Sequence, residues 1–398
     1  MLITEDEIDR AVADLSGVMR RTPVVASRVL SERVDADVWL KCENLQRTGS
    51  FKPRGAYLRI SRLSPDERAR GVVAASAGNH AQGVAWSATR LGIGSRVYMP
   101  VGAALPKVAA TKAYGAEVVL HGTTVDEALL EAHAYADRTG AALIHPFDHR
   151  DIVTGQATVG AETLDQIPDV GTIVVPLGGG GLLAGVAAAV KPRRPDVRIV
   201  GVQAEQAAAW PDSLREGGPV PVSRMSTMAD GIAVARPGDV PFAHVAELVD
   251  DVVTVSEDAI STALLLMLER AKLLVEPAGA VGVAALMGGD LEVSGRVCVV
   301  ASGGNIDPLV LSHVTTYGLA AAGRFLTVTA TVPDRPGGLI SLLELLSAQG
   351  ASVVDVTHSR VSEELSLGEV QVTVSAETRG PDHQAAVRDA LGAAGFLR

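Results

Sequence analysis

The stretch TIVVPLGGGGLLAGVAAAV, residues 172–190, decides the fold. It has the pattern of a buried, β-branched strand that ends in four glycines and continues into an alanine-rich helix. The same order of short apolar strand, small-residue turn and helix recurs from about Val38 to Val300, which is typical of βαβ units and a mostly parallel sheet. Strands are predicted in DVWLKCE, GVVAAS, SRVYMP, AEVVLHG, AALIHP, TIVVPLG, RIVGVQAE, DDVVTVS and RVCVVASGG.

The pattern changes after LAAAGR, from about Leu326 onward. Alternating strands FLTVTATVP, ASVVDVTHSR and EVQVTVSAET are interleaved with two amphipathic helical segments, LISLLELLSAQG and DHQAAVRDALGAAG. This βαββα order, with space for one more short strand at the end, predicts a small ferredoxin-like module. We therefore expect a separate C-terminal domain over residues 326–398. The linker-like stretches are REGGPVPVS and LAAAGR.

Composition narrows the class of ligand. The chain has 398 residues, 46 acidic against 35 basic, and a formal net charge of −11. That charge repels polyanions and argues against nucleic acid or an anionic membrane as partner, so a small molecule is expected. Cys42 and Cys298 are too few for a disulfide framework or a cysteine-rich metal site. The acidic start of the chain and the lack of a long apolar run predict neither a signal peptide nor a membrane span, and we expect a cytoplasmic protein.

The glycines Gly178, Gly179, Gly180 and Gly181 stand at the start of the predicted helix. Their backbone N–H groups can converge on an anion at the positive end of that helix, which favours phosphate binding over a simple tight turn. The spacing of Gly179, Gly181 and Ala184 also fits a dinucleotide fingerprint, with Glu205 as a ribose-binding acid. The pattern does not decide between a dinucleotide and another phosphate-bearing ligand.

Two further strand ends carry polar residues. Ser302, followed by two glycines, can exchange a hydrogen bond with a ring nitrogen, or it can belong to a Ser-Gly turn. The other end places N–H groups and an amide where a carboxylate or a ring hydroxyl can bind, or where a side chain caps the helix. That second turn consists of Ser76, Ala77, Gly78, Asn79 and His80.

Lys52 lies in RTGSFKPRGA, residues 47–56. Pro53 predicts a helix start, which places Lys52 near the positive end of a helix and lowers its pKa toward a free amine. Phe51 and Pro53 are expected to restrict and desolvate this amine, and Gly49 and Gly55 to leave space for a ring. An amine, an anion cradle, a carboxylate site and a ring-nitrogen partner are together the groups that pyridoxal phosphate needs.

The chain resembles the threonine dehydratases (threonine ammonia-lyases), pyridoxal-phosphate enzymes of fold type II. The resemblance spans about residues 5 to 320, and a segment that resembles an ACT domain follows it, with DRPGGL at its first turn. The motifs that carry the resemblance are ENLQRTGSFKPRGA (43–56), SAGNHAQG (76–83), GQATVGAE (155–162), PLGGGGLLAG (176–185), MADGIAVARPG (228–238), EPAGA (276–280) and SGGNID (302–307).

The resemblance implies two open α/β lobes within a catalytic domain of residues 1–320, the smaller lobe of about 50–150 being inserted in the larger one. It implies pyridoxal 5'-phosphate bound to Lys52 beside Phe51, its ring oxygen near Asn79 and its ring nitrogen near Ser302. The implied phosphate cradle is Gly178 to Gly181, and the implied substrate-carboxylate site is Ser76 to His80. Glu276 either faces the cofactor or serves as a helix-start carboxylate.

The implied reaction is dehydration of L-threonine to 2-oxobutanoate and ammonia. Lys52 then acts twice, as the covalent anchor of the cofactor and as the base that removes the Cα proton. No carboxylic acid in the motifs is an evident donor to the leaving hydroxyl, so the cofactor's phosphate is the expected one. Related serine racemases hold a divalent cation with a pair of acidic residues. This chain has one of them, Glu205, but Pro211 takes the place of the second, so the metal requirement is unknown.

Alternatives stay open at this stage. Serine dehydratase and serine racemase are the alternatives on the same scaffold, and a nucleotide-binding or amino-acid-sensing protein is the alternative of another class. The ACT segment predicts control by an amino acid such as isoleucine or valine, or a purely oligomeric role, and a homo-oligomer (dimer or tetramer) is expected. The residues predicted to bind the effector are Asp334, Arg335, Pro336, Gly337 and Gly338.

Overall fold

A computed structural model describes residues 2–289, 291–321, 323–360 and 365–397. Contacts within the chain group residues 1–310 and 311–398 into two compact units. The functional domains proposed from the sequence, 1–320 and 326–398, divide the chain slightly later, within or after helix α14 (Pro308–Ala321).

The first unit contains a six-stranded sheet in the order β1-β2-β10-β7-β8-β9. Only β1, which the sequence pattern did not predict, pairs antiparallel; the other neighbours pair parallel, as expected of βαβ units. Every residue of β7 is buried, as is typical of a central parallel strand covered on both faces. The strands are β1 (Val24–Ala26), β2 (Asp37–Lys41), β7 (Thr172–Pro176), β8 (Arg198–Ala204), β9 (Asp251–Val255) and β10 (Arg296–Val300).

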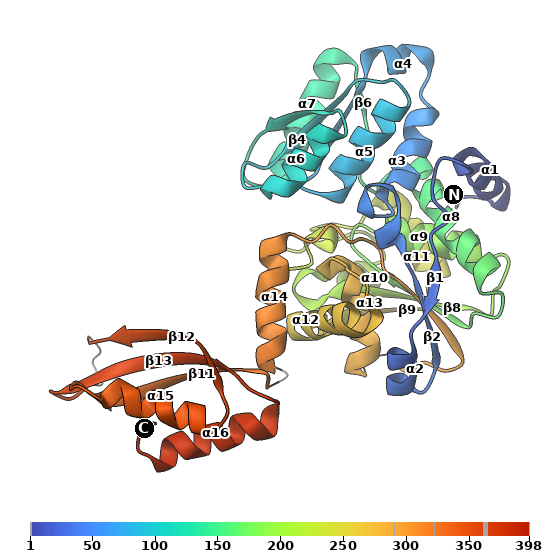
Figure 1. The fold of residues 1–398 in the computed structure, drawn as a ribbon. Helices are drawn as coiled ribbons and strands as arrows, with labels where there is room; N and C mark the ends of the chain where they lie inside the picture. The colour runs from blue at the N-terminus through green and yellow to red at the C-terminus, as the bar shows by residue number, and fades with distance from the viewer. Residues whose placement is uncertain (1, 290, 322, 361–364, 398) are drawn as a thin grey trace. The chain divides into compact units, whose positions relative to one another are not determined.

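Helices pack on both faces of this sheet, as Figure 1 shows. All ten residues of α9 are buried, which explains why the helix is apolar on every side. The helices and short helical turns of this lobe are α1 (Glu5–Leu15), α2 (Arg28–Val34), η1 (Glu43–Leu45), η2 (Arg47–Gly49), α8 (Arg150–Gln166), α9 (Gly181–Val190), η3 (Glu205–Ala207), α10 (Trp210–Glu216), η4 (Asp230–Ile232), α11 (Asp239–Leu248), α12 (Glu257–Leu266), η5 (Met267–Ala271) and α13 (Pro277–Gly288).

The smaller lobe of the first unit contains a parallel four-stranded sheet in the order β5-β4-β3-β6. Its helices surround this sheet (Figure 1), and the lobe lies in the chain between β2 and β7 of the larger lobe. The elements are α3 (Lys52–Ser61), α4 (Pro65–Arg70), β3 (Val72–Ala75), α5 (Asn79–Arg90), β4 (Ser95–Met99), α6 (Leu105–Ala113), β5 (Glu117–Leu120), α7 (Val125–Thr139) and β6 (Ala142–Leu143).

The second unit is an antiparallel sheet with two helices on one face (Figure 1). Alternate residues of β11 are buried under these helices, as the apolar-polar alternation of the sequence predicts. In place of the additional last strand, the chain end contributes the Phe396 carbonyl, which accepts a hydrogen bond of 2.8 Å from the N–H of Thr331. The strands pair in the order β11-β13-β12. Along the chain the elements are β11 (Phe325–Pro333), α15 (Gly338–Ala348), β12 (Ser352–Ser359), β13 (Glu369–Glu377) and α16 (Pro381–Ala393).

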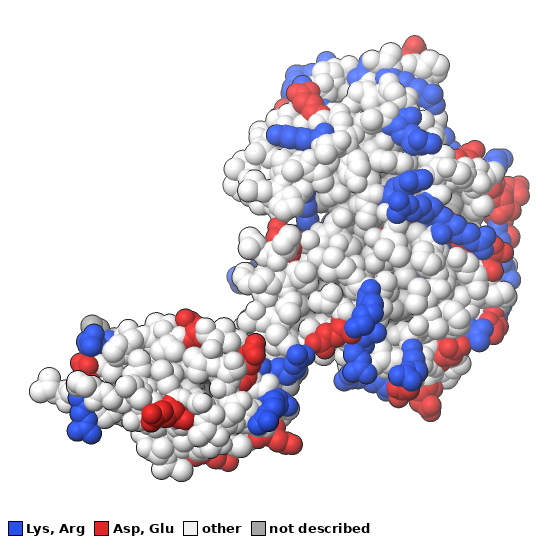
Figure 2. Space-filling model, in the orientation of Figure 1, with Lys and Arg blue, Asp and Glu red and all other residues white. Residues whose placement is uncertain are grey.

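The surface carries both signs of charge. On the face drawn in Figure 2, Lys and Arg side chains lie close to Asp and Glu side chains. Among the residues that the structure describes, none of the helices combines the length and the apolar character needed to cross a membrane.

Candidate active site

One cavity of the first unit is lined by all nine residues predicted from the sequence to bind the cofactor. It lies where β7 and β10 end and where α3, α5, α9 and α13 begin. Ligands of open α/β sheets bind at such carboxyl ends of strands. The predicted residues that line it are Phe51, Lys52, Asn79, Gly178, Gly179, Gly180, Gly181, Glu276 and Ser302.

Lys52 is the first residue of α3, one position earlier than the proline start predicted from the sequence. Its Nζ donates a hydrogen bond of 3.1 Å to the Pro146 carbonyl and lies 5.1 Å from the centre of the Phe51 ring. Burial lowers the pKa of Lys52 to about 8, against an opposing influence of the Glu276 carboxyl. This ammonium therefore gives up its proton far more readily than an exposed lysine, and the free amine is a nucleophile toward an aldehyde.

This lowered pKa predicts how the protein takes up an aldehyde cofactor. We expect the rate at which cofactor-free protein binds pyridoxal phosphate covalently to rise with pH and to reach half its maximum near pH 8. An ordinary lysine, with a pKa of about 10.4, would still be gaining rate above pH 10. Stopped-flow absorbance across pH 6.5 to 10 measures this rate, and a profile that keeps rising through pH 10 would contradict the assignment.

The four glycines form the turn between β7 and α9. Gly180 has φ +97° and precedes the helix, a backbone conformation that glycine adopts without a steric cost. The indole Nε1 of Trp210 donates a 2.6 Å hydrogen bond to the Gly178 carbonyl, which fixes that carbonyl away from the helix start. The turn therefore directs the positive end of α9 toward the cavity, as an anion cradle requires.

Asn79, at the start of α5, is held between two partners. Its Nδ2 donates 2.6 Å to the Glu276 carboxylate, and its Oδ1 accepts 2.8 Å from Asn305. Burial, together with the charge of Asp230, raises the pKa of Glu276 to about 7 although Asn79 acts in the other direction. Glu276 lines the cavity and also precedes α13 as its N-cap residue, and its carboxyl can hold a proton near neutral pH.

Ser302 lies two residues after the end of β10 and is buried. Its carbonyl accepts a 3.1 Å hydrogen bond from the Phe51 N–H, and the next residue, Gly303, pairs with Ser50 in an isolated bridge. These contacts tie the end of β10 directly to the segment that carries Lys52. Direct backbone contacts therefore connect the segments of Lys52 and Ser302, the two residues predicted to contact opposite ends of the cofactor ring.

The turn of Ser76 to His80 stands beside the cavity, and Asn79 is its member that lines it. Ser76 Oγ accepts from the Gly78 N–H at 3.1 Å, so this hydroxyl orders the turn itself. The His80 ring lies in the small-lobe interior within 2.7 Å of the Ile144 carbonyl, and burial lowers its pKa to about 3. Any contact of His80 with a substrate would therefore come from its backbone N–H.

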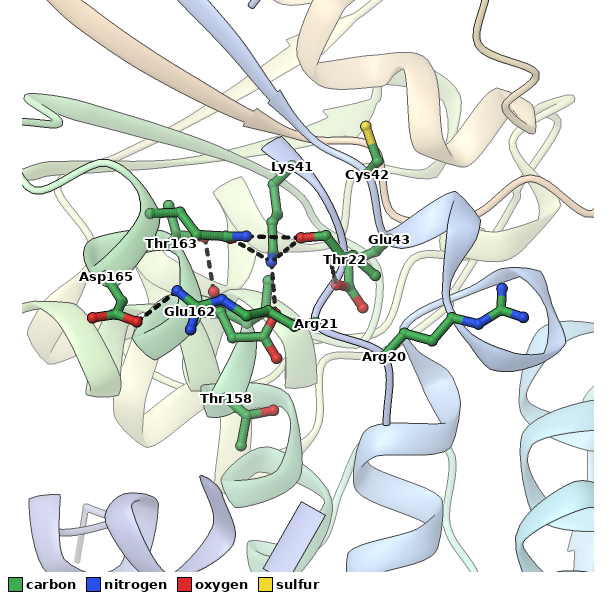
Figure 3. Close-up of polar contacts among 12 residues, drawn as sticks. Arg20, Arg21, Thr22, Lys41, Cys42, Glu43, Thr158, Glu162, Thr163 and Asp165 are labelled. Carbon is green, nitrogen blue, oxygen red and sulfur yellow. Dashed lines mark hydrogen bonds and ion pairs between the residues drawn. The ribbon is translucent and has the colours of Figure 1, made fainter. Parts of the chain in front are cut away.

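A buried cluster of charges holds the start of α3 in place. Arg54 reaches Glu43 through two hydrogen bonds of 2.8 Å and Glu162 through two of 2.7 and 3.0 Å. Lys41 donates to Glu162 at 2.6 Å and to the Thr22 carbonyl at 3.0 Å, as Figure 3 shows. The cluster is neutral in total, and loss of one partner from such a buried arrangement costs about 3–5 kcal/mol.

Close backbone packing completes this support. A Cβ on Gly155 of α8 would lie 2.6 Å from the Gly55 Cα, so the two helices touch directly, three residues beyond Lys52. The expectation that Gly49 and Gly55 leave space for a ring is therefore wrong. The space at Gly55 is filled by the Gln156 amide and the Ile152 carbonyl, and the space at Gly49 by the Asn305 side chain.

The structure adds residues that sequence reasoning missed. Phe147 and Ile232 line the cavity, and the amide oxygen of Gln156 is buried there with no hydrogen-bond partner among the described residues. Gln156 belongs to the GQATVGAE motif, but nothing in its residue type indicates which side of a long helix faces a ligand. Glu205, the proposed ribose acid, is exposed and is not among the residues that line the cavity.

The loop predicted to bind an effector connects β11 to α15 in the second unit. Asp334 pairs with Arg360 at 3.1 Å, and Arg335, Pro336 and Gly337 complete the turn. Gly337 has φ +97°, and a Cβ on Gly338 would lie 2.3 Å from the Pro333 carbonyl. The loop is therefore tightly formed at the start of a helix.

Comparison with known proteins gives consistent results. The model of the family described as pyridoxal-phosphate dependent enzyme matches residues 15–303, and an ACT domain model matches residues 324–394. A Thermotoga maritima protein named L-threonine ammonia-lyase is 44% identical over 99% of this chain and 98% of its own.

Two solved structures of related enzymes have a similar fold. The processed form of threonine deaminase isoform 2 from Solanum lycopersicum has a TM-score of 0.74 and 37% identity, covering 79% of this chain and 89% of that one. Maize serine racemase has a TM-score of 0.76 and 34% identity, covering 81% of this chain and 99% of that one.

Proposed function

The chain belongs to the family of pyridoxal-phosphate-dependent enzymes, and from that premise we propose that it is an L-threonine ammonia-lyase with a C-terminal ACT domain. It converts L-threonine to 2-oxobutanoate and ammonia, and L-serine to pyruvate as a second substrate. The full-length relative from Thermotoga maritima supports the substrate. The observation that carries the proposal is that an amine of lowered pKa, a glycine cradle and Ser302 line one cavity.

The residues of the cavity fit the cofactor. Gly178 to Gly181 present the start of α9 to a phosphate, and Lys52 offers the amine that an aldehyde needs. The hydrogen bonds of Asn79 to Glu276 and Asn305 hold its amide at the cavity, which supports a contact with a ring oxygen. When bound, the cofactor withdraws electrons from the substrate Cα, and beside a neutral serine its ring nitrogen stays largely unprotonated, which suits elimination better than transamination.

The chain's own groups then handle the protons. Lys52, once its amine is free, removes the proton from the substrate Cα, and its lowered pKa makes it an effective base at neutral pH. The β-hydroxyl leaves as water, and hydrolysis of the remaining enamine releases ammonia and the keto acid. The Glu276 carboxyl, with a pKa of about 7, holds or gives up a proton beside Asn79.

The substrate preference is tested by kinetics with two amino acids. We expect kcat/KM for L-threonine to exceed that for L-serine by about 10- to 100-fold, the range that one methyl group in an apolar pocket provides. Keto-acid release measures both rates, and chiral analysis of unreacted serine accompanies them. A higher value for L-serine would favour a serine dehydratase, and accumulation of D-serine would favour a racemase.

We further propose that the second unit binds an amino-acid effector at Asp334, Arg335, Pro336, Gly337 and Gly338, and that the enzyme is a cytoplasmic dimer or tetramer. The tightly formed loop with its Asp334–Arg360 pair supports a site at this helix start. Titration of activity with isoleucine and valine tests regulation. A response to neither of these, nor to serine or threonine, would leave the ACT domain a purely structural role.

A further inference from the structure

Lys107 is a buried charged residue in α6, a helix in which the apolar Leu105 is exposed. Only 9% of Lys107 is accessible to solvent, whereas 82% of Leu105, two residues earlier, is exposed. Soluble proteins normally show the opposite arrangement, because burying an ammonium group is unfavourable whereas burying a leucine side chain is favourable. A specific partner must therefore hold Lys107 in this place.

One partner is Asp230, which pairs with the Lys107 ammonium across the two lobes of the first unit. Asp230 begins η4, and the two residues that follow it, Gly231 and Ile232, line the cofactor cavity. The Asp230 side chain remains 56% exposed, and ion pairs with an exposed member contribute about 0–1 kcal/mol. The pair alone therefore does not account for a buried lysine.

The second neighbour is the turn expected to receive the substrate carboxylate. A Cβ on Gly78 would lie 3.6 Å from the Lys107 Nζ, so the ammonium lies against the Ser76–Asn79 turn. Lys107 and Asp230 also both act on the Glu276 carboxyl, which itself lines the cavity and binds Asn79. The ammonium thus stands beside the active site, next to a turn of which Asn79 lines the cavity.

We propose that Lys107 binds the α-carboxylate of the amino-acid substrate at the Ser76–Asn79 turn, and that its ammonium is paired with Asp230 until the substrate arrives. This inference rests on the proposed function and deepens it, because it names the group that selects substrates with a free carboxylate. The start of α5, with its positive helix end, adds N–H donors to the same anion.

A purely structural tie between the lobes makes a different prediction. If the Lys107–Asp230 pair only fixed the lobes, removing either charge would weaken all ligands of the cavity alike. A carboxylate-binding lysine instead distinguishes an amino acid from its uncharged amide. Neutralising Asp230 would then leave the preference for the acid intact, because the cation remains.

The test measures binding of two unreactive ligands, L-2-aminobutanoate and its amide, to the holoenzyme by isothermal titration calorimetry. For Lys107→Gln we expect the acid to bind roughly 10- to 100-fold more weakly, the loss typical of a charge-assisted contact, and the amide to change less than about 3-fold. Lys107→Arg should keep most of the preference for the acid. Lys112→Gln, an exposed lysine of the same helix, is the matched control and should leave both affinities unchanged.

Two outcomes would overturn the proposal. One is equal weakening of acid and amide in Lys107→Gln, or no change in either; the other is loss of the preference for the acid in Asp230→Asn. If Lys107→Gln does not fold, the Lys107→Arg and Asp230→Asn proteins still decide between the two roles. The ligands carry no leaving group, so failure of the proposed threonine chemistry would appear separately, as an absence of 2-oxobutanoate from L-threonine with the unsubstituted enzyme.

Discussion

Replacing Lys52 with alanine is expected to lower the rate of L-threonine deamination by roughly 1,000-fold or more. The substitution removes the side chain that we propose both anchors the cofactor and takes the Cα proton, and no second amine is present among the described residues that line the cavity. Phosphate binding at the glycine turn does not depend on this side chain, so the variant should still take up pyridoxal phosphate without covalent attachment.

The measurement compares keto-acid release with cofactor content after gel filtration and after borohydride treatment. Lys112→Ala is the control, because this lysine is exposed on α6 outside the cavity. A Lys52→Ala protein that binds the cofactor and retains full activity would refute the role of Lys52, while a loss of activity in Lys112→Ala would point to a general effect on the lobe.

Replacing Gly180 with alanine is expected to weaken pyridoxal-phosphate binding by about 100-fold. The new Cβ would lie 2.3 Å from the Trp210 ring and 2.7 Å from Pro241, at a φ of +97° that side chains rarely adopt. Relief of both conflicts requires the glycine turn to move, which displaces the N–H groups that we propose bind the phosphate. Absorbance titration of cofactor-free protein with pyridoxal phosphate measures the affinity.

Gly217→Ala is the matched control for this prediction. Gly217 also has a positive φ, +73°, but a Cβ there would meet nothing within 4 Å. Alanine at Gly217 meets the same unfavourable positive φ as alanine at Gly180 but without the crowding. The cofactor affinity of Gly217→Ala should therefore stay within about 2-fold of the original, since open surface sites tolerate change. Equal effects of the two substitutions would mean that stability, and not the shape of the turn, limits cofactor binding.

Much of the fold could be predicted because its signals are local. All nine strands predicted between Asp37 and Gly304 are present, since each is an apolar run with a small-residue end. The short strand β1, Val24–Ala26, was missed because three residues next to a helix give no periodicity. Sheet order could not be read either, since the antiparallel edge and the place of β10 between β2 and β7 depend on contacts across the chain.

The same distinction applies to the site. Lys52, Asn79, Gly178 to Gly181, Glu276 and Ser302 follow recognisable turns, and the cavity brings them together. The cluster of Lys41, Arg54, Glu43 and Glu162 was not predicted, because its members are far apart in sequence and buried charges resemble surface charges in a sequence. The Lys107–Asp230 pair was missed for the same reason.

The most direct test of the account is the absorbance spectrum of the purified protein before and after addition of L-threonine, with simultaneous detection of keto acid and ammonia. We predict a visible band of lysine-bound pyridoxal phosphate that borohydride fixes to Lys52. We also predict that L-threonine changes this band while 2-oxobutanoate and ammonia form in equal amounts. A protein loaded with pyridoxal phosphate that shows no such band, or that forms no 2-oxobutanoate from L-threonine, would contradict the account.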